Sequence, residues 1–409
     1  MKAYLIKASA GGDYSKYKAE TGGPPQNIFS TAAATPADVA LEMTDETIGM
    51  KTNFGSEAQI VAIFMSTPDA LRAYEIADVF RSKGKTVVLG GLHTKFNQAE
   101  ALAHADALLI GETEGIWESL LRDYQKGELK LKYQREQPVD LAELKPYPTN
   151  LIHPSKYNWT WSVVVGRGCP HKCQFCLVHR FLDHCRFRPI EQIVEEVRQL
   201  KKMGVAWVEL HADNLTVNRK YALALFKALA PLKMKLYGET TILIAEDEEL
   251  LKAARQAGLK ALLFGIETPS QAALEAQGKK FVKPKIVKGY IARVKRHGIK
   301  VWADFLVGFD KHDPSIFEDT WNFIKQIKAN RVFPHLVIPF PGSNTFRALE
   351  AQGRILTKDW SQYDGSHVVF QPKRMTSAEL EEGLTWLWLK EMGMVKSFLY
   401  SWVTPGAWR

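Results

Sequence analysis

Cysteine is scarce in this sequence: there are four among 409 residues, and all four lie between Cys169 and Cys185. A secreted protein held together by disulfides distributes its cysteines along the chain. The clustering therefore predicts metal binding in a reducing compartment, and hence a cytoplasmic protein.

Long hydrophobic runs are also absent. No stretch reaches the roughly 18 apolar residues that a membrane-spanning helix requires, so we expect no membrane span. The first residues, Met1 to Ile6, give way to polar sequence by Gly11. They lack the apolar core of a signal peptide, and we expect no such peptide here.

Positive charge is in excess but is not concentrated in one run. The formal net charge is +9 and the pI is about 9.1, with Lys and Arg spread along the chain. Nucleic-acid binding requires a basic patch, so we expect a small-molecule substrate and no nucleic acid partner. The length and the 46% hydrophobic content predict a large buried core in two or three domains.

The first part of the sequence alternates short apolar runs with segments of helical spacing. This alternation predicts an α/β domain with a doubly wound, Rossmann-like parallel sheet over residues 1–136, followed by a Pro-containing linker over 137–150. The predicted strands are 3–7, 60–65, 86–89 and 107–110, and the predicted helices are 70–83, 101–105 and 114–124.

Six further strand–helix units follow over residues 151–340. Six units are too few to close an eight-stranded barrel, so we predict an open, partial (β/α)6 TIM-like barrel. Its active site is expected at the carboxyl ends of the strands. The predicted strands are 161–165, 206–210, 236–243, 262–266, 301–307 and 332–338.

The C-terminal segment, residues 341–409, is rich in aromatic residues, and a helix is predicted over 379–400. Two roles fit such a segment: a cap packed on the barrel, or an apolar wall for a lipid or a ring-containing substrate. The aromatic residues are Trp360, Tyr363, Trp386, Trp388, Tyr400, Trp402 and Trp408.

The loop after the first barrel strand carries three cysteines, Cys169, Cys173 and Cys176, at the spacing C-x3-C-x2-C. An ordinary four-iron cluster takes four cysteines. Three thiolates on one loop would therefore hold three irons and leave the fourth iron free for a substrate-like ligand.

A zinc site is the alternative explanation of these cysteines, with Cys185, His171 or His179 as the fourth ligand. Structural zinc sites are often built from two C-x2-C pairs, and only one such pair is present. We expect Cys185 to be a structural thiol, because free cysteines are commonly buried.

The cysteine loop, with Phe175 directly before the last cysteine, resembles the signature of the radical S-adenosylmethionine (AdoMet) superfamily. The resemblance implies a [4Fe-4S] cluster on the three cysteines and AdoMet on its open iron. It also implies that strand-end residues contact AdoMet, since carboxylates suit its ribose and ammonium and glycine permits close approach. The implied AdoMet-binding residues are Phe175, Asp213, Glu239, Glu267 and Gly308.

The first domain resembles the cobalamin-binding domain that precedes the barrel in one branch of that superfamily. The implied cobalamin-binding residues are Ser66, Thr67, Gly90, Gly91, His93, Gly111 and Glu112. The Asp-x-His-x-x-Gly motif that supplies a cobalt ligand elsewhere is absent, so His93 is not assumed to bind cobalt. A flavodoxin-like domain without a cofactor is the alternative.

The resemblance implies a function: a cobalamin-dependent C-methyltransferase acting on an unactivated carbon through a 5′-deoxyadenosyl radical and methylcobalamin. Flavodoxin or ferredoxin is the implied electron donor, and the aromatic tail favours an apolar or ring-containing substrate. The alternatives are an AdoMet radical cyclase or rearrangement enzyme, and a non-enzymatic metal-binding module. The sequence indicates neither the catalytic acid or base nor the oligomeric state.

Overall fold

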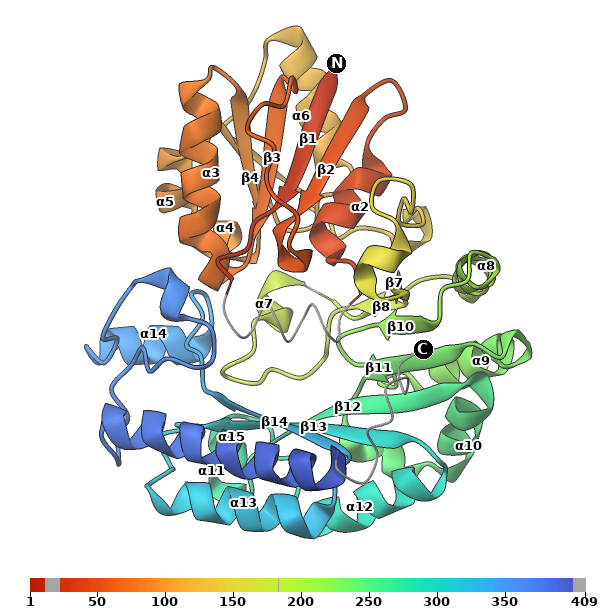
Figure 1. The fold of residues 1–409 in the computed structure, drawn as a ribbon, viewed down its shortest axis with the longest axis vertical. Helices are drawn as coiled ribbons and strands as arrows, with labels where there is room; N and C mark the ends of the chain where they lie inside the picture. Colours follow the sequence, from red (N-terminus) through yellow and green to blue (C-terminus); the bar gives the residue numbers. More distant parts are fainter. Residues whose placement is uncertain (12–22, 183, 400–409) are drawn as a thin grey trace.

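The computed structural model describes residues 1–11, 23–182 and 184–399. Two parallel β-sheets form its framework, one from the first third of the chain and one from the middle (Figure 1). None of the helices in the described ranges combines the length and the apolar character that crossing a membrane requires.

The first sheet has the strand order β2-β1-β3-β4-β5-β6, and every neighbouring pair is parallel. The order from β2 to β5 is that of flavodoxin-like doubly wound folds, which bind ligands beyond the carboxyl ends of their strands. The strands are β1 (Lys2–Lys7), β2 (Ala40–Asp45), β3 (Ile60–Met65), β4 (Thr86–Gly91), β5 (Ala107–Ile110) and β6 (Lys132–Gln134).

Helices cover both faces of this sheet, which explains why its central strands are apolar throughout. Residues of α2 and α6 share one hydrophobic core with one face of the sheet, and residues of α3 and α5 share a second core with the other face. The helices are α2 (Gln26–Ala34), α3 (Ala70–Ser82), α4 (Leu92–Phe96), α5 (Gln98–Ala103) and α6 (Ile116–Lys126). The predicted doubly wound sheet is confirmed, although β2, β6, α2 and α4 were not predicted.

Gly91 ends β4 in a conformation that only glycine adopts easily. Its φ is +108°, and a Cβ there would overlap the carbonyl oxygen of Met65 on β3. We expect Gly91→Ala to destabilise the fold by about 2 kcal/mol or more. The strain of a positive φ and the clash of the new Cβ with the backbone of Met65 both contribute to this loss. Gly84→Ala is the matched control, since Gly84 has φ +70° and nothing within 4 Å of its Cβ position. The melting temperatures of the two variants, measured by thermal unfolding, test this. An equal decrease in both variants would contradict the clash at Gly91.

The second sheet contains six parallel strands in chain order, as predicted. The strands are β7 (Thr160–Val164), β10 (Trp207–His211), β11 (Lys235–Glu239), β12 (Leu259–Glu267), β13 (Lys300–Val307) and β14 (Arg331–Leu336). The helices between them are α8 (Ile190–Lys202), α9 (Arg219–Leu229), α10 (Glu248–Ala257), α11 (Gln271–Ala276), α12 (Pro284–Arg296) and α13 (Ser315–Ile327).

One predicted strand was too long. A strand was predicted over residues 236–243, but β11 ends at Glu239. The apolar side chains beyond it, including Ile242 and Ile244, are buried in a 3-10 helix over Ile242–Glu246. A buried run of this length has no periodicity that separates strand from helix.

The C-terminal segment packs against both sheets. It contains α14 (Asn344–Ala351) and α15 (Ser377–Leu399). Trp360 and Tyr363 are buried, and the indole of Trp360 lies 5.1 Å from the ring of His93 in the first domain. Trp360 is thus packed against the first domain, and a cap on the barrel stays a prediction for these two aromatics. Trp386 and Trp388 pack on the same core from α15. The three remaining aromatics, Tyr400, Trp402 and Trp408, lie outside the described residues.

Candidate cluster and cofactor site

The cysteine loop leaves the second sheet at the carboxyl end of β7. A two-residue strand, β8 (Gly166–Arg167), pairs antiparallel with β9 (Arg186–Phe187) and so closes the base of the loop. Gly168 follows with φ +89°, where a Cβ would overlap the carbonyl of His184. The short helix α7 (Val178–Phe181) begins directly after the last cysteine. The sequence thus forces a tight loop that holds all three cysteines at one strand end.

The three thiols are close enough to influence one another electrostatically. Burial raises the pKa of Cys169 and Cys173, and it raises the pKa of Cys176 to about 12, with the other two thiols adding to that shift. The backbone N–H of Val178 donates to the sulfur of Cys176 at 3.4 Å. Three thiolates so placed are unfavourable by themselves, and bound metal cations would stabilise them.

The zinc alternative and the cluster share the three loop cysteines as ligands. Within the described ranges, no three His, Cys, Asp or Glu side chains, these cysteines included, are gathered to hold a single metal ion. The ring of His171 instead stacks on Phe281, with centroids 3.9 Å apart.

Gln174, which the sequence analysis did not select, anchors the cysteine loop on two sides. Its backbone N–H donates to the carbonyl of Gln277 at 3.0 Å, and its own carbonyl accepts from Thr345 at 3.1 Å. Its side chain accepts from Asn344 at 2.8 Å. The loop is therefore tied both to the segment after β12 and to the start of α14.

Asp213 contacts the base of the cysteine loop. Its carboxylate accepts from the backbone N–H of Gly168 at 2.7 Å. Asn214 follows, is buried, and accepts at 2.9 Å from Thr240, while its side chain also reaches the sulfur of Cys169. This turn after β10 thus supports the loop, and its role toward AdoMet stays a prediction.

Glu267 and Glu239 lie at the ends of neighbouring strands but in different surroundings, and for Glu239 the strand end was not predicted, because the predicted strand ran on to residue 243. Glu239 is exposed. Glu267 is buried, adopts φ +68°, and forms an ion pair with the buried Lys279. The ammonium of Lys279 also lies 5.9 Å from the ring centre of Phe175. A buried cation therefore stands beside the cysteine loop, a feature that no sequence motif indicated.

Gly308 links the ends of two strands through a histidine. Its backbone N–H donates to Nδ1 of His312 at 3.3 Å, so Nε2 carries the proton and donates to Thr268 at 3.1 Å. Burial lowers the pKa of His312 to about 4, which keeps the ring neutral at physiological pH. Phe309, next in the chain, packs on Phe175 at 5.9 Å.

Asp304 is an ionisable residue in the largely apolar strand β13, and it was not selected from the sequence. It pairs in register with Gly265, where the Glu267–Lys279 ion pair fills the space a side chain would need. Burial raises the pKa of Asp304 well above its usual value, and the carboxylates of Glu267 and Glu239 raise it further. A protonated Asp304 would be a hydrogen-bond donor on the inner face of the sheet.

The raised pKa gives a pH prediction with a defined sign. The folded protein holds the Asp304 proton more tightly than the unfolded chain, so stability falls as pH rises above about 4 toward the folded pKa. Asp304→Asn removes this titration. We expect the melting temperature of the variant to exceed that of the native protein at pH 8 and to differ little from it at pH 4. An equal difference in melting temperature at both pH values would contradict the raised pKa of Asp304.

The predicted cobalamin-binding residues on β3 and β4 have structural partners. Ser66 hydrogen-bonds Asp69, and Thr67 is buried in the same capped turn. A Cβ on Gly90 would meet the ring of Phe64 at 2.9 Å. Close packing of β3 against β4 therefore accounts for both Gly90 and Gly91, and contact of these residues with cobalamin stays a prediction.

His93 is enclosed within the protein. Its Nδ1 lies 3.2 Å from the side-chain amide of Asn97, and its Nε2 lies 3.8 Å from the carboxylate of Glu100. The indole N–H of Trp360 donates to that same carboxylate at 2.8 Å. Gly111, by contrast, has φ +89° and no atom within 4 Å of its Cβ position. Gly111 is thus the glycine of this set that borders open space.

A buried ion cluster joins the loop after β5 to the cysteine loop. Arg167 lies 2.7 Å from Glu112 and 2.6 Å from Glu114, and Arg186 lies 3.0 Å from Glu112. The hydroxyl of Ser30 accepts from Arg167 at 3.1 Å. Both loops follow the carboxyl end of a strand, so these edges of the two sheets face each other (Figure 1). Glu112, predicted at the cobalamin site, therefore holds the domains together.

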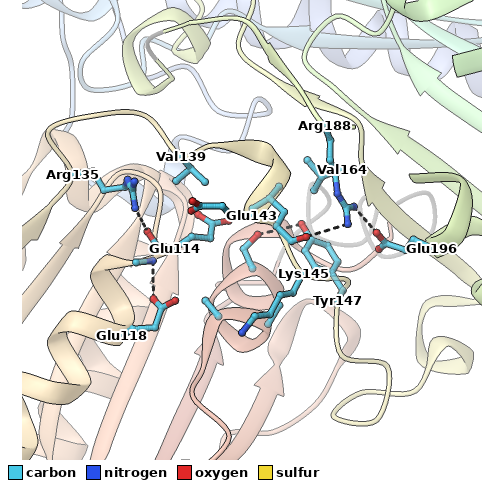
Figure 2. Close-up of a pocket in the computed structure, with 15 residues that line it drawn as sticks. Glu114, Glu118, Arg135, Val139, Glu143, Lys145, Tyr147, Val164, Arg188 and Glu196 are labelled. Carbon is cyan, nitrogen blue, oxygen red and sulfur yellow. Dashed lines mark hydrogen bonds and ion pairs between the residues drawn. The ribbon is translucent and has the colours of Figure 1, made fainter. Parts of the chain in front are cut away.

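A cavity of about 110 Å³ lies beside this cluster, between the two domains. Figure 2 shows Glu114 and Arg135 on one side of it and the Arg188–Glu196 ion pair on the other. The carboxylate of Glu114 is already bound by Arg167, which holds the pKa of Glu114 below its usual value despite burial. Three of the lining residues, Glu114, Arg188 and Glu196, are held in ion pairs, and small and apolar residues form much of the remaining wall.

Comparison with known proteins gives consistent matches over most of the chain. The Radical SAM superfamily profile matches residues 163–324. Bacteriochlorophyllide d C-8(2)-methyltransferase from Chlorobaculum tepidum is 30% identical, over 83% of this chain and 79% of the relative. An anaerobic magnesium-protoporphyrin IX monomethyl ester cyclase from Cereibacter sphaeroides is 24% identical, over 73% and 53% respectively.

Solved structures share the fold at low sequence identity. The radical S-adenosylmethionine methyltransferase TsrM from Kitasatospora setae, with cobalamin and a [4Fe-4S] cluster bound, gives a TM-score of 0.69 at 14% identity, covering 86% of this chain and 78% of that one. The cobalamin-dependent radical enzyme OxsB, with aqua-cobalamin and S-adenosylmethionine bound, gives 0.72 at 14% identity, covering 99% and 69%.

The two facing sheets and the three-cysteine loop between them define an enzyme of the class that uses an iron–sulfur cluster at the end of a parallel sheet. The chain belongs to the radical SAM superfamily.

Proposed function

We propose that this enzyme is a cobalamin-dependent radical AdoMet C-methyltransferase acting on an unactivated carbon. The observation that carries the proposal is the placement of the three-cysteine loop at the edge of the second sheet that faces the carboxyl edge of a flavodoxin-like sheet. Two cofactor sites so arranged can serve one substrate between them. When bound, the cofactors supply reductive cleavage of AdoMet and a transferable methyl group.

The cluster fits the residues that are present. Cys169, Cys173 and Cys176 are the donor set, and the sulfur of Cys176 already accepts a backbone hydrogen bond. The chain's own role is to hold the loop rigid through Gln174 and Asp213, and to place Lys279 and Glu267 beside it. A cation and carboxylates at this place suit the carboxylate and the ammonium of AdoMet.

Cobalamin fits the first sheet through its topology and its edge. Gly111 leaves space there, and the hydroxyl of Thr94 is a buried polar atom without a hydrogen-bond partner among the described residues. His93 is buried, and its Nε2 lies 3.8 Å from the carboxylate of Glu100. We therefore propose that the domain binds the cofactor without histidine ligation from His93.

The substrate we propose is a small, apolar, ring-containing molecule. Aromatic side chains, among them Tyr237 on β11 and Trp302 on β13, approach each other across the intervening strand β12, with ring centroids 5.9 Å apart. The bacteriochlorophyllide methyltransferase relative favours a planar macrocycle within that class. The electron donor is proposed to be flavodoxin or ferredoxin. A cytoplasmic location is proposed because free cysteines require a reducing compartment.

The test is anaerobic turnover with AdoMet carrying a deuterated methyl group and a panel of tetrapyrroles. The proposal expects 5′-deoxyadenosine, S-adenosylhomocysteine and a product that has gained the labelled methyl group. A labelled product is lost if cobalamin is withheld.

The second candidate is ring formation or rearrangement without methylation. The cyclase relative favours it, since it too aligns with most of this chain. The same assay separates the two: 5′-deoxyadenosine and a product of altered connectivity, with no S-adenosylhomocysteine, would select the second candidate.

A further inference from the structure

A basic hollow lies on the surface beside the cysteine loop. Its volume is about 540 Å³, and it is lined by Ala273, Ala276, Gln277, Phe309, Asp310, Lys311, Lys373 and Arg374. These residues come from three separate parts of the chain: α11 and its end, the loop after β13, and the segment before α15. The sequence alone showed Lys and Arg spread along the chain, and folding brings some of them together here.

Positive charge dominates the hollow. Asp310 is paired with Arg354 at 2.6 Å, and Asp313 nearby is paired with Arg374 at 2.9 Å. Within the described ranges, Lys311 and Lys373 have no ion-pair partner, and both are exposed.

The segment that follows the lining residue Gln277 contacts the cysteine loop. The carbonyl of Lys172, a residue of that loop, lies 3.4 Å from the Cβ position of Gly278. Lys172 and Lys280 are both exposed.

Two direct contacts join the wall of the hollow to the cysteine loop. The carbonyl of Gln277 accepts from the backbone N–H of Gln174, which directly follows Cys173. The ring of Phe309 packs on Phe175, which directly precedes Cys176, at 5.9 Å. A molecule seated in the hollow is thus separated from the cysteine ligands by one layer of residues.

We propose that this hollow is the docking surface for an acidic electron-carrier protein of the flavodoxin class. A small acidic redox protein complements the local positive charge, and opposite charges steer such encounters. The short path through Gln277 and Phe309 suits transfer of one electron. The carrier is oxidised by one electron, from hydroquinone to semiquinone, and the protein's cluster is reduced by one. The inference rests on the proposed function, which requires such a reductant.

The test is the affinity of the loaded protein for a purified oxidised flavodoxin, which binds without turnover. We expect Lys311→Glu combined with Lys373→Glu to raise the Kd at least tenfold at low salt. Raising the salt concentration is expected to weaken the native interaction and to narrow the difference between the two proteins, because exposed charges are screened. Binding by the double variant as tight as native binding would overturn the proposal.

Lys220→Glu with Lys252→Glu is the matched control. It makes the same charge change on exposed lysines of α9 and α10, beside the other end of the second sheet. We expect its Kd to stay near the native value. An equal loss of affinity in both double variants would show that flavodoxin is attracted only by the net charge of the protein. That result would overturn the proposed docking site.

A chemical reductant separates this proposal from the proposed function. Dithionite needs no docking surface, so the Lys311/Lys373 variant is expected to cleave AdoMet at the native rate with dithionite and more slowly with reduced flavodoxin. Failure of the native protein to cleave AdoMet with dithionite would contradict the proposed function. The docking proposal would then be decided by the Kd measurement alone.

Discussion

Replacing Cys176 by alanine is expected to abolish iron retention and AdoMet cleavage together. The thiol lies at the end of the loop, where its sulfur accepts a backbone hydrogen bond and its burial raises its pKa to about 12. The hydrogen bond from the backbone stabilises a neutral buried thiol little, whereas a metal-bound thiolate at this position is stabilised by the metal cation. With only two cysteines left on the loop, a four-iron cluster lacks the ligands to persist. Iron and sulfide analysis after anaerobic reconstitution measures this.

Cys185→Ala is the control for that experiment. Cys185 is partly buried, and Cys169 is close enough to it to raise the pKa of Cys185. Cys185 lies beyond the three-cysteine loop. We expect this variant to keep the full iron content. If Cys185→Ala lost iron as completely as Cys176→Ala, four cysteines would hold the metal, and the open iron that AdoMet requires would not exist.

Arg167→Met is expected to produce the largest loss of stability among single substitutions at the domain interface. The guanidinium is buried and satisfies Glu112 and Glu114 at once. Truncation leaves Glu114 charged and without its cation, which costs about 3–5 kcal/mol in comparable buried pairs. The lowered pKa of Glu114 means that this stabilisation is present at neutral pH and disappears as the pH falls through its folded value. Thermal unfolding at pH 7 measures the loss.

Two further variants distinguish a broken ion cluster from a general packing defect. Arg167→Met combined with Glu114→Gln removes the unpaired buried carboxylate. We expect this double variant to recover part of the melting temperature that Arg167→Met loses. Arg219→Met, in an exposed ion pair with Asp247, is expected to change the midpoint little. A double variant no more stable than Arg167→Met would contradict the electrostatic explanation.

The second sheet could be predicted because its strands are short apolar runs separated by amphipathic helices. The first sheet was predicted less completely. The missed edge strand β2 (Ala40–Asp45) is buried over only its last half, so its apolar pattern is weak. The missed helix α2 (Gln26–Ala34) consists mainly of small and hydroxyl residues, which carry little periodic signal. Local patterns therefore indicate elements buried on both faces better than they indicate edges.

The cysteines could be predicted from their spacing, but their surroundings could not. Arg167 and Glu112 are 55 residues apart in the chain, and neither belongs to a motif that implies contact with the other. Lys279 and Glu267 meet only because β12 bulges at its end. Asp304 is the exception: an acid within the largely apolar run from Val301 to Val307 was a visible signal for a titratable group in the sheet.

The central claim is that one chain holds a four-iron cluster and cobalamin at facing sheet edges. The most direct measurement is anaerobic purification with cobalamin supplied, followed by an absorption spectrum and iron, sulfide and cobalt counts per chain. We expect about four irons, matching sulfide and one cobalt per chain, with cobalt retained in His93→Ala. A protein that binds zinc in place of iron, or that carries a full cluster and no cobalt, would contradict it.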